Sequence, residues 1–165
     1  MKKGKIFAVI AALLVTASTG AFASGNFGIG VQGGFVPGMH HHGDAALTFK
    51  IPKVPPVFAV NVGIWDYEVH RVGVTADWWL ANPNITGVLN WFYGPGLAAG
   101  ATFNMGNGRA CDLYVGGRFV IGLNAFVVNF LELYVQAAAQ IGIDTANSGI
   151  FDWGIPANLG IRFWF

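Results

Sequence analysis

The sequence predicts an all-β protein, an eight-stranded antiparallel up-and-down transmembrane β-barrel, on the strength of three observations. The chain of 165 residues is 54% hydrophobic and only 10% charged, whereas a soluble domain carries about 25% charged residues. Apolar residues alternate with polar or small ones along eight segments, which is the period of a β-strand. The last of these segments ends the chain on aromatic residues. This composition excludes a disordered chain and favours a wall that faces lipid.

The first 23 residues are expected to be a secretory signal peptide. Three lysines precede an apolar run from Ile6 to Val15, and the small-residue site Ala21-Phe22-Ala23 follows. We therefore expect residues 1–23 to direct export through the Sec pathway and residues 24–165 to form the barrel. Without those three lysines, six Lys and Arg remain against eight Asp and Glu. The mature chain is then no polycation, and a nucleic-acid partner is not expected.

The central part of the chain favours strands over a membrane helix. No charged residue occurs between Asp77 and Arg109, and hydropathy alone would suggest a helical span there. The stretch contains Asn82-Pro83-Asn84 and Gly94-Pro95-Gly96, which interrupt a helix that has to satisfy its own backbone in lipid.

Alternation with a period of two defines the expected strands. It is clearest from Leu131, where odd positions are mostly large and aliphatic and even positions are mostly polar or small. The same reading gives eight segments, at roughly 25–36, 45–51, 57–65, 70–80, 88–103, 111–123, 130–143 and 154–165. Eight strands make the smallest common closed barrel.

The charged strand residues indicate which face meets lipid. A soluble eight-stranded barrel such as a lipocalin also alternates, but it keeps its apolar face inside. Here the strand charges lie opposite the large aliphatic residues: Lys50, Asp77, Arg118, Glu132 and Arg162. Exposing the aliphatic face to water costs about 25 cal/mol per Å², and Arg or Lys on a lipid face costs about 2–4 kcal/mol. The apolar face is therefore predicted to face lipid, and the charges to face the lumen.

The connections and aromatic residues support the same orientation. Connections at 37–44, 66–69, 104–110 and 144–153 hold most of the loop charges, whereas those at 52–56, 81–87 and 124–129 are turns marked by Pro or Asn. Outer-membrane barrels have longer outer loops, short periplasmic turns and periplasmic termini. Aromatic residues are expected to form girdles near the strand ends: Phe27, Phe35, Trp65, Trp78, Trp91 and Tyr93.

The end of the chain carries a family resemblance. Asn158, Gly160, Phe163 and Phe165 match the C-terminal assembly signal of bacterial outer-membrane barrels. Across nearly all of the mature chain the sequence resembles small eight-stranded outer-membrane proteins, the class of the OmpA membrane domain and OmpX. The segments 113–119, 131–135 and 159–165 are similar to a group of uncharacterised spirochaetal and related barrels. The resemblance implies the outer membrane of a diderm bacterium, with periplasmic chaperones and the barrel-assembly machinery as partners.

The five strand charges are the first candidate site. Lys50, Asp77, Arg118, Glu132 and Arg162 are expected to form ion pairs that plug the lumen, because isolated charges in a narrow interior are costly. A gated ion path is the alternative arrangement of the same residues.

The sequence also contains one cluster with metal-ligand chemistry, His40, His41 and His42, followed by Asp44. Adjacent residues of an extended loop point in different directions, so three histidines in a row are poorly spaced for one site. The hypothesis is therefore weak binding of Zn²⁺, Cu²⁺ or Ni²⁺, against the alternative of a solvated or pH-sensitive loop.

We expect no enzyme and no cofactor. The serines of the mature chain are Ser24, at its start, and Ser148, in a predicted loop, and the strand-associated histidine is His70. A serine nucleophile needs an adjacent base, so lipid acyl transfer is disfavoured. The expected role is structural, with loops that present a surface to an extracellular ligand; the alternative is a small-solute porin or a carrier of small apolar molecules.

Overall fold

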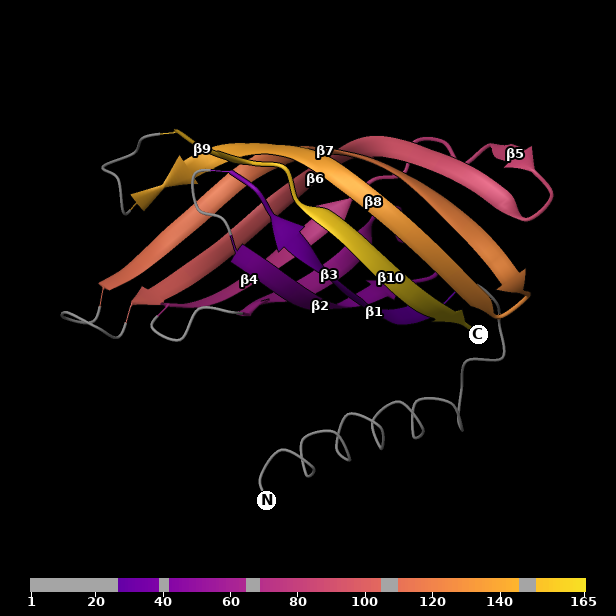
Figure 1. Cartoon of the computed structure of the whole chain (residues 1–165), viewed down its shortest axis with the longest axis horizontal. Helices are drawn as coiled ribbons and strands as arrows, with labels where there is room; N and C mark the ends of the chain where they lie inside the picture. The colour runs from indigo at the N-terminus through magenta and orange to yellow at the C-terminus, as the bar shows by residue number, and fades with distance from the viewer. Residues whose placement is uncertain (1–26, 39–41, 65–68, 105–109, 146–150) are drawn as a thin grey trace, which may run out of the picture.

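A computed structural model of the protein describes residues 27–38, 42–64, 69–104, 110–145 and 151–165, and it confirms the predicted barrel. The strands are β1 (Gly28–Val36), β2 (His42–Lys50), β3 (Val57–Ile64), β4 (Val69–Asp77), β5 (Asn84–Thr86), β6 (Leu89–Asn104), β7 (Ala110–Val128), β8 (Leu131–Asp144), β9 (Phe151–Gly154) and β10 (Ala157–Trp164). They form one sheet in which neighbours pair antiparallel and which closes on itself (Figure 1). Residues 1–23 lie outside the described part.

The ten strands occupy only eight positions around the barrel wall, which we call staves. β9 and β10 are two parts of the eighth, because both pair with β8 in a single continuous register: Gln140 opposes Gly154, and Ala137 opposes Ala157. The break falls at Ile155 and Pro156, where proline has no N–H to give to the ladder. β5 pairs only with the start of β6. The barrel closes where β10 pairs with β1.

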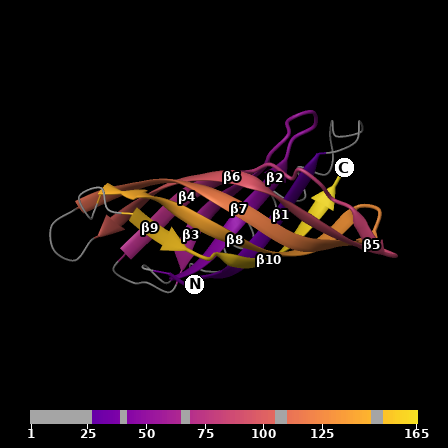
Figure 2. The ribbon, with the colours of Figure 1, turned by 90° about the horizontal axis from the view of Figure 1, so that it is seen from above.

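The strand register fixes the stagger of the barrel. Opposed residues can be followed once around the wall from Gly28 through Lys50, Val57, Asp77, Gly96, Arg118, Gln140 and Gly154 to Gly38. The path returns to the first stave ten residues further along, which is a shear number of ten. A stagger of this kind requires strands tilted by about 35–45°, and Figure 2 shows the strands crossing the long axis obliquely.

The two ends of the barrel are defined by the chain. At the terminal end Gly28 opposes Trp164, and the turn between β7 and β8 and the β5 hairpin lie there as well (Figure 1). At the opposite end, which we call the loop end, β1, β3, β6 and β8 end and β2, β4, β7 and β9 begin. Within the described residues no helix has the length and apolarity to cross a membrane.

Side chains sort by face as the sequence predicted. The buried polar residues point into the lumen, among them Gln32, Thr48, Thr75, Asp77, Arg118, Asn124, Glu132, Gln136, Asn158 and Arg162. The exposed residues on the outer wall are large and apolar, among them Val31, Leu47, Val60, Val74, Leu97, Val115, Ile121, Val135, Ile141 and Leu159. A soluble lipocalin-like barrel would have the reverse distribution, so the wall is that of a transmembrane barrel.

Several of the predicted boundaries were wrong. β4 ends at Asp77 and not at residue 80, and β5 and the start of β9 fall within the predicted connections 81–87 and 144–153. The turn expected at 124–129 is largely strand, because β7 continues to Val128 and Asn124 stands inside the ladder opposite Asn90 and Tyr134. Asn marked a turn in the sequence, but here its side chain has a buried partner in the lumen. β2 begins at His42, within the predicted connection 37–44, because the ladder with β1 runs up to the pair Val36 and His42.

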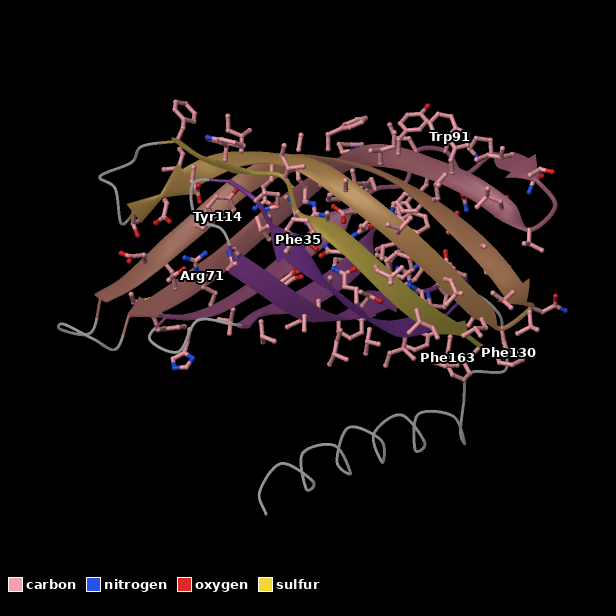
Figure 3. The ribbon with its side chains drawn as sticks, in the orientation of Figure 1. Phe35, Arg71, Trp91, Tyr114, Phe130 and Phe163 are labelled. Atoms are coloured by element: carbon pink, nitrogen blue, oxygen red, sulfur yellow. The ribbon has the colours of Figure 1, made fainter. Side chains whose placement is uncertain are left out.

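Aromatic side chains lie toward both ends of the outer wall. Figure 3 shows Trp91, Phe130 and Phe163 toward the terminal end. Phe151 and Trp153, on β9 at the loop end, are exposed. Trp65, one of the residues expected in a girdle, lies outside the described residues.

Candidate functional site in the barrel lumen

Glu132 lies at the centre of a buried cluster near the terminal end. Its side chain is 0% exposed. Arg162 Nη1 donates to its Oε2 at 2.9 Å, Trp164 Nε1 donates to the same oxygen at 2.8 Å, and Asn124 Nδ2 donates to Oε1 at 2.8 Å. Three donors, one of them a cation, are the kind of surroundings a buried carboxylate requires.

Arg162 is held by rings as well as by this carboxylate. It is 1% exposed, and its guanidinium carbon lies 5.3 Å from the ring centroid of Trp79, 4.7 Å from that of Tyr134 and 5.7 Å from that of Trp164. Cation–π contacts at these distances stabilise a desolvated guanidinium by up to about 2 kcal/mol each. Arg162 therefore joins the ionic and aromatic parts of the cluster.

An aromatic layer completes the closure. Trp79 stacks on Phe92 with centroids 3.8 Å apart, and Phe92 and Val120 are both 0% exposed. Two inward glycines leave room for these rings: a Cβ at Gly160 would strike the Tyr134 ring, and one at Gly122 would strike Phe92. We call the residues that fill the bore here the seal: Trp79, Phe92, Val120, Asn124, Glu132, Tyr134, Arg162 and Trp164.

Above the seal, toward the loop end, lie a polar layer and a second ion pair. Tyr134 Oη donates to Gln32 Oε1 at 3.0 Å. Arg118 Nε lies 3.1 Å from Asp77 Oδ1, and both side chains are buried. Asp77 on β4 opposes Gly96 on β6, and Gly96 opposes Arg118 on β7, so the ion pair extends across three neighbouring strands.

The structure thus brings four of the five predicted lumen charges together, as Arg162 with Glu132 and Arg118 with Asp77. Lys50 joins neither pair. It ends β2 at the terminal end, and its ammonium donates to the carbonyl of Val54 in the following turn. A lysine at the last position of a strand reaches the mouth of the barrel, where a backbone carbonyl serves as its partner.

Toward the loop end the lumen opens into a cavity of about 350 Å³. Its polar lining includes His42, Asp44, Asn61, Arg71, Thr75, Thr102, Asp112, Tyr114, Arg118, Gln140, Asp144, Asp152 and Asn158. Figure 3 shows Arg71 and Tyr114 on the loop-end side of the barrel. The side chains of Arg71 and His42 contact each other here, with Nη1 2.7 Å from Nδ1. We call this space the loop-end cavity.

Only one of the three consecutive histidines can be placed. His40 and His41 lie outside the described residues, and His42 is on β2 beside Arg71. In the part of the chain that the structure describes, no group of three His, Cys, Asp or Glu side chains is arranged to hold a metal ion. Zn²⁺ binding by His40, His41 and His42 stays a hypothesis. Ser24 and Ser148 also lie outside the described residues.

The predicted C-terminal signal residues occupy β10 and the residue after it. Asn158 is buried in the lumen, and Gly160 gives room to Tyr134. The Phe165 N–H donates to the Phe27 carbonyl at 2.9 Å. The packing of the barrel interior therefore accounts for Asn158 and Gly160 without reference to an assembly signal.

Sequence reasoning missed the place of Asn124 in the seal and the contact of Trp79 with a charge. Asn124 was interpreted as a turn residue, and Trp78 was expected in a girdle without any role being given to its neighbour Trp79 in binding a charge. The signal that identifies both is parity, because Trp79 shares the face of Asp77 and Asn124 shares the face of Arg118. Which ring contacts Arg162 depends on the shear number of the barrel, and a single sequence does not define the shear number.

Together these features define a small, closed, eight-stranded outer-membrane type of barrel. No protein-family model and no curated protein sequence matches the chain. Among solved structures, the chain is similar to Neisserial surface protein A at 10% identity, with 86% of this chain and 97% of that one covered and a TM-score of 0.53. It is also similar to the N-terminal β-barrel domain of OprF from Pseudomonas aeruginosa, at 14% identity, with 86% and 100% covered and a TM-score of 0.52. At these identities the likeness shows the fold, and the chain has the fold of the small eight-stranded outer-membrane barrels.

Proposed function

We propose that this protein is an integral outer-membrane barrel with a structural and surface-interaction role, and that its lumen does not conduct. The observation that carries the proposal is the seal, in which a triply hydrogen-bonded carboxylate and a ring-enclosed guanidinium fill the bore. A path through it would require a buried charge to lose its partners, which costs about 3–5 kcal/mol.

The outer wall supports insertion in a bilayer. Exposed aliphatic residues occupy the middle of every long strand, such as Leu97 in β6, Ile121 in β7 and Val135 in β8. A continuous apolar surface of this kind is unstable in water and suits the hydrocarbon layer. Export by the Sec pathway and assembly by the barrel machinery follow from the predicted signal peptide and from the C-terminal residues.

The orientation follows from the connections. Turns such as Asn129–Phe130 at the terminal end are short, and the connections at the loop end carry most of the loop charges. We infer that the loop end faces outward and the terminal end faces the periplasm, as the topology of such barrels requires for an even number of strands. Loops on the outer face are then available to a ligand, without an enzymatic role.

Planar-bilayer recording of the refolded protein tests the seal. The unmodified barrel is expected to give no resolvable unitary conductance. Trp79→Ala together with Phe92→Ala should open discrete steps, because it removes the aromatic layer while leaving the Glu132 hydrogen bonds in place. Ile121→Ala on the outer wall is the control and should remain silent. Steps of equal size in all three proteins would mean that solutes bypass the seal, and the porin alternative would replace the proposal.

Heat-modifiable migration on a gel after refolding in detergent, together with a β-rich circular dichroism spectrum, tests the membrane assignment. Folded barrels of this kind keep their shape in detergent until they are heated, because the strands form a closed hydrogen-bonded ring. A chain that is monomeric and folded in water without detergent would contradict the proposal.

A further inference from the structure

The loop-end cavity has no part in the seal, and its shape is that of a binding site. Its volume of about 350 Å³ lies within the range of small-molecule sites, about 300–1,000 Å³. Side chains from most of the staves contribute to its lining, and the seal closes the bore beneath it. A solute can therefore enter and leave only through the loop end.

The charge of this cavity is negative. Among the described residues, four carboxylates line it, Asp44, Asp112, Asp144 and Asp152, against the two guanidinium groups of Arg71 and Arg118. Asp112, Asp144 and Asp152 lie near the loop-end termini of the adjacent staves β7, β8 and β9. Lumen carboxylates with apolar walls around them focus a negative potential. A cationic group is the favoured occupant.

The occupant is better described as an organic cation than as a metal ion. A metal needs several ligands within about 2.0–2.6 Å of one point, and no group of three such side chains is arranged for one among the described residues. The carboxylates instead surround a space that is large enough for several non-hydrogen atoms, as an amine on a carbon skeleton requires.

A second, independent feature points to a neutral polar group on the same molecule. Arg118 is 7% exposed and lines the cavity at its deep side, and its Nη2 has no hydrogen-bond partner in the described part of the protein. Asp77 contacts its Nε, and Asp44 lines the cavity beside it. Because carboxylates already offset the charge of Arg118, a hydroxyl or carbonyl oxygen is a better partner for Nη2 than another anion.

The rim of the loop-end cavity provides a hydrogen-bond acceptor for the cationic group. Asp152 Oδ1 is buried and also has no hydrogen-bond partner among the described residues. A buried carboxylate oxygen without a donor is costly, and an ammonium group supplies up to three donors. The deep donor and the rim acceptor therefore complement the two ends of one molecule.

We propose that the loop-end cavity binds a small hydroxylated organic amine of the amino-sugar or amino-alcohol class, with its ammonium group at the rim aspartates and an uncharged oxygen toward Arg118. The single route of entry rests on the proposed function, but the binding itself requires only the folded barrel and its cavity, so it can be measured in detergent micelles whether or not the lumen conducts.

Isothermal titration of the refolded protein tests the proposal, with glucosamine and glucose as the probes. The two differ by one amine, and a polyoxyethylene detergent is used so that no sugar headgroup competes. Glucosamine is expected to bind at least tenfold more tightly than glucose, and its affinity should fall as NaCl rises. Equal affinities, or no heat from glucosamine at millimolar concentration, would overturn the proposal.

Two variants connect the binding to the cavity. Asp152→Asn should weaken glucosamine about tenfold or more, because it removes a charged hydrogen-bond acceptor, whereas Asp152→Glu keeps the charge and should stay close to the unmodified protein. Both sit at the rim, away from the seal, and heat-modifiable migration verifies that they fold. Unchanged binding in Asp152→Asn would place the amine elsewhere and would overturn the proposal.

Discussion

At the scale of single residues, the packing of the lumen near the terminal end depends on Glu132. It accepts hydrogen bonds from an arginine and a tryptophan on β10 and from an asparagine on β7. No other described side chain contacts so many members of the seal through hydrogen bonds. Its burial is tolerable only because these partners replace the water that the carboxylate has lost.

Glu132→Ala is expected to lower the free energy of unfolding by about 3–5 kcal/mol, because it leaves the buried Arg162 guanidinium without its counter-charge. Urea titration in lipid vesicles, followed by tryptophan fluorescence, measures the change. The double variant Glu132→Ala with Arg162→Met should recover most of the loss, because no unpaired charge remains. A double variant as unstable as the sum of the two single variants would show that the two side chains do not interact.

Gly160→Ala is expected to destabilise the barrel by about 1–3 kcal/mol, because its Cβ enters the space of the Tyr134 ring. Gly117→Ala is the matched control, since nothing lies within 4 Å of a Cβ at that position, and its effect should stay under about 0.5 kcal/mol. The same urea titration compares the two. Equal losses would mean that the cost comes from the strand backbone and not from the packing of Tyr134.

At the scale of elements, the strands differ in length, and the long ones are β6, β7 and β8. Their outward faces are apolar throughout their middle, so a charge placed there should cost more than the same charge at their ends. This depth dependence is a property of the lipid layer, which distinguishes it from a general intolerance of arginine.

Leu97→Arg, in the middle of β6, should destabilise the barrel by about 2–4 kcal/mol in vesicles, and Val88→Arg, before the start of β6 at the terminal end, by about 0–1 kcal/mol. The two side chains are similarly exposed, at 58% and 59%, so exposure alone does not separate them. Unfolding titrations in the same lipid give both values. Losses of equal size would argue against a bilayer around the middle of the wall.

Removal of Phe165 is expected to reduce the amount of assembled protein in cells several-fold, while refolding of the purified chain in detergent stays efficient. The contrast separates a role in recognition by the assembly machinery from the contribution of the contacts of Phe165 within the barrel, which include a backbone hydrogen bond to Phe27. Heat-modifiable migration reports the assembled fraction in both settings, and Phe165→Tyr is the control. A loss of equal size in both would assign Phe165 to barrel stability alone.

The strands could be predicted from the sequence because the alternation of residues within one segment indicates which side chains face the lumen and which face outward. Alternation assigned Arg118, Glu132 and Arg162 to the lumen, and the structure places all three there. The partners of these charges were not predictable, because a stagger of ten residues around eight staves decides which strands are level with one another. Asn124 illustrates the limit: its residue type favours a turn, and only Glu132 across the ladder explains why the strand continues.

At the scale of the whole molecule, the lumen has two different halves. The terminal half is filled by rings and paired charges, and the loop half is an open, acidic space. The stagger contributes to both halves, because strongly tilted strands widen a barrel of a given strand number. The wider bore needs two tryptophans, a phenylalanine and a tyrosine to close it, and it leaves room where such large side chains are absent.

A barrel lumen that is open at only one end carries no net flux of solute. With the closure that we propose, a solute that enters the loop-end cavity leaves by the same opening, so the occupancy of the cavity depends on the solute concentration on that side of the membrane and not on a gradient across it. With the closure that we propose, the solute concentration in the compartment behind the seal is unaffected by that occupancy.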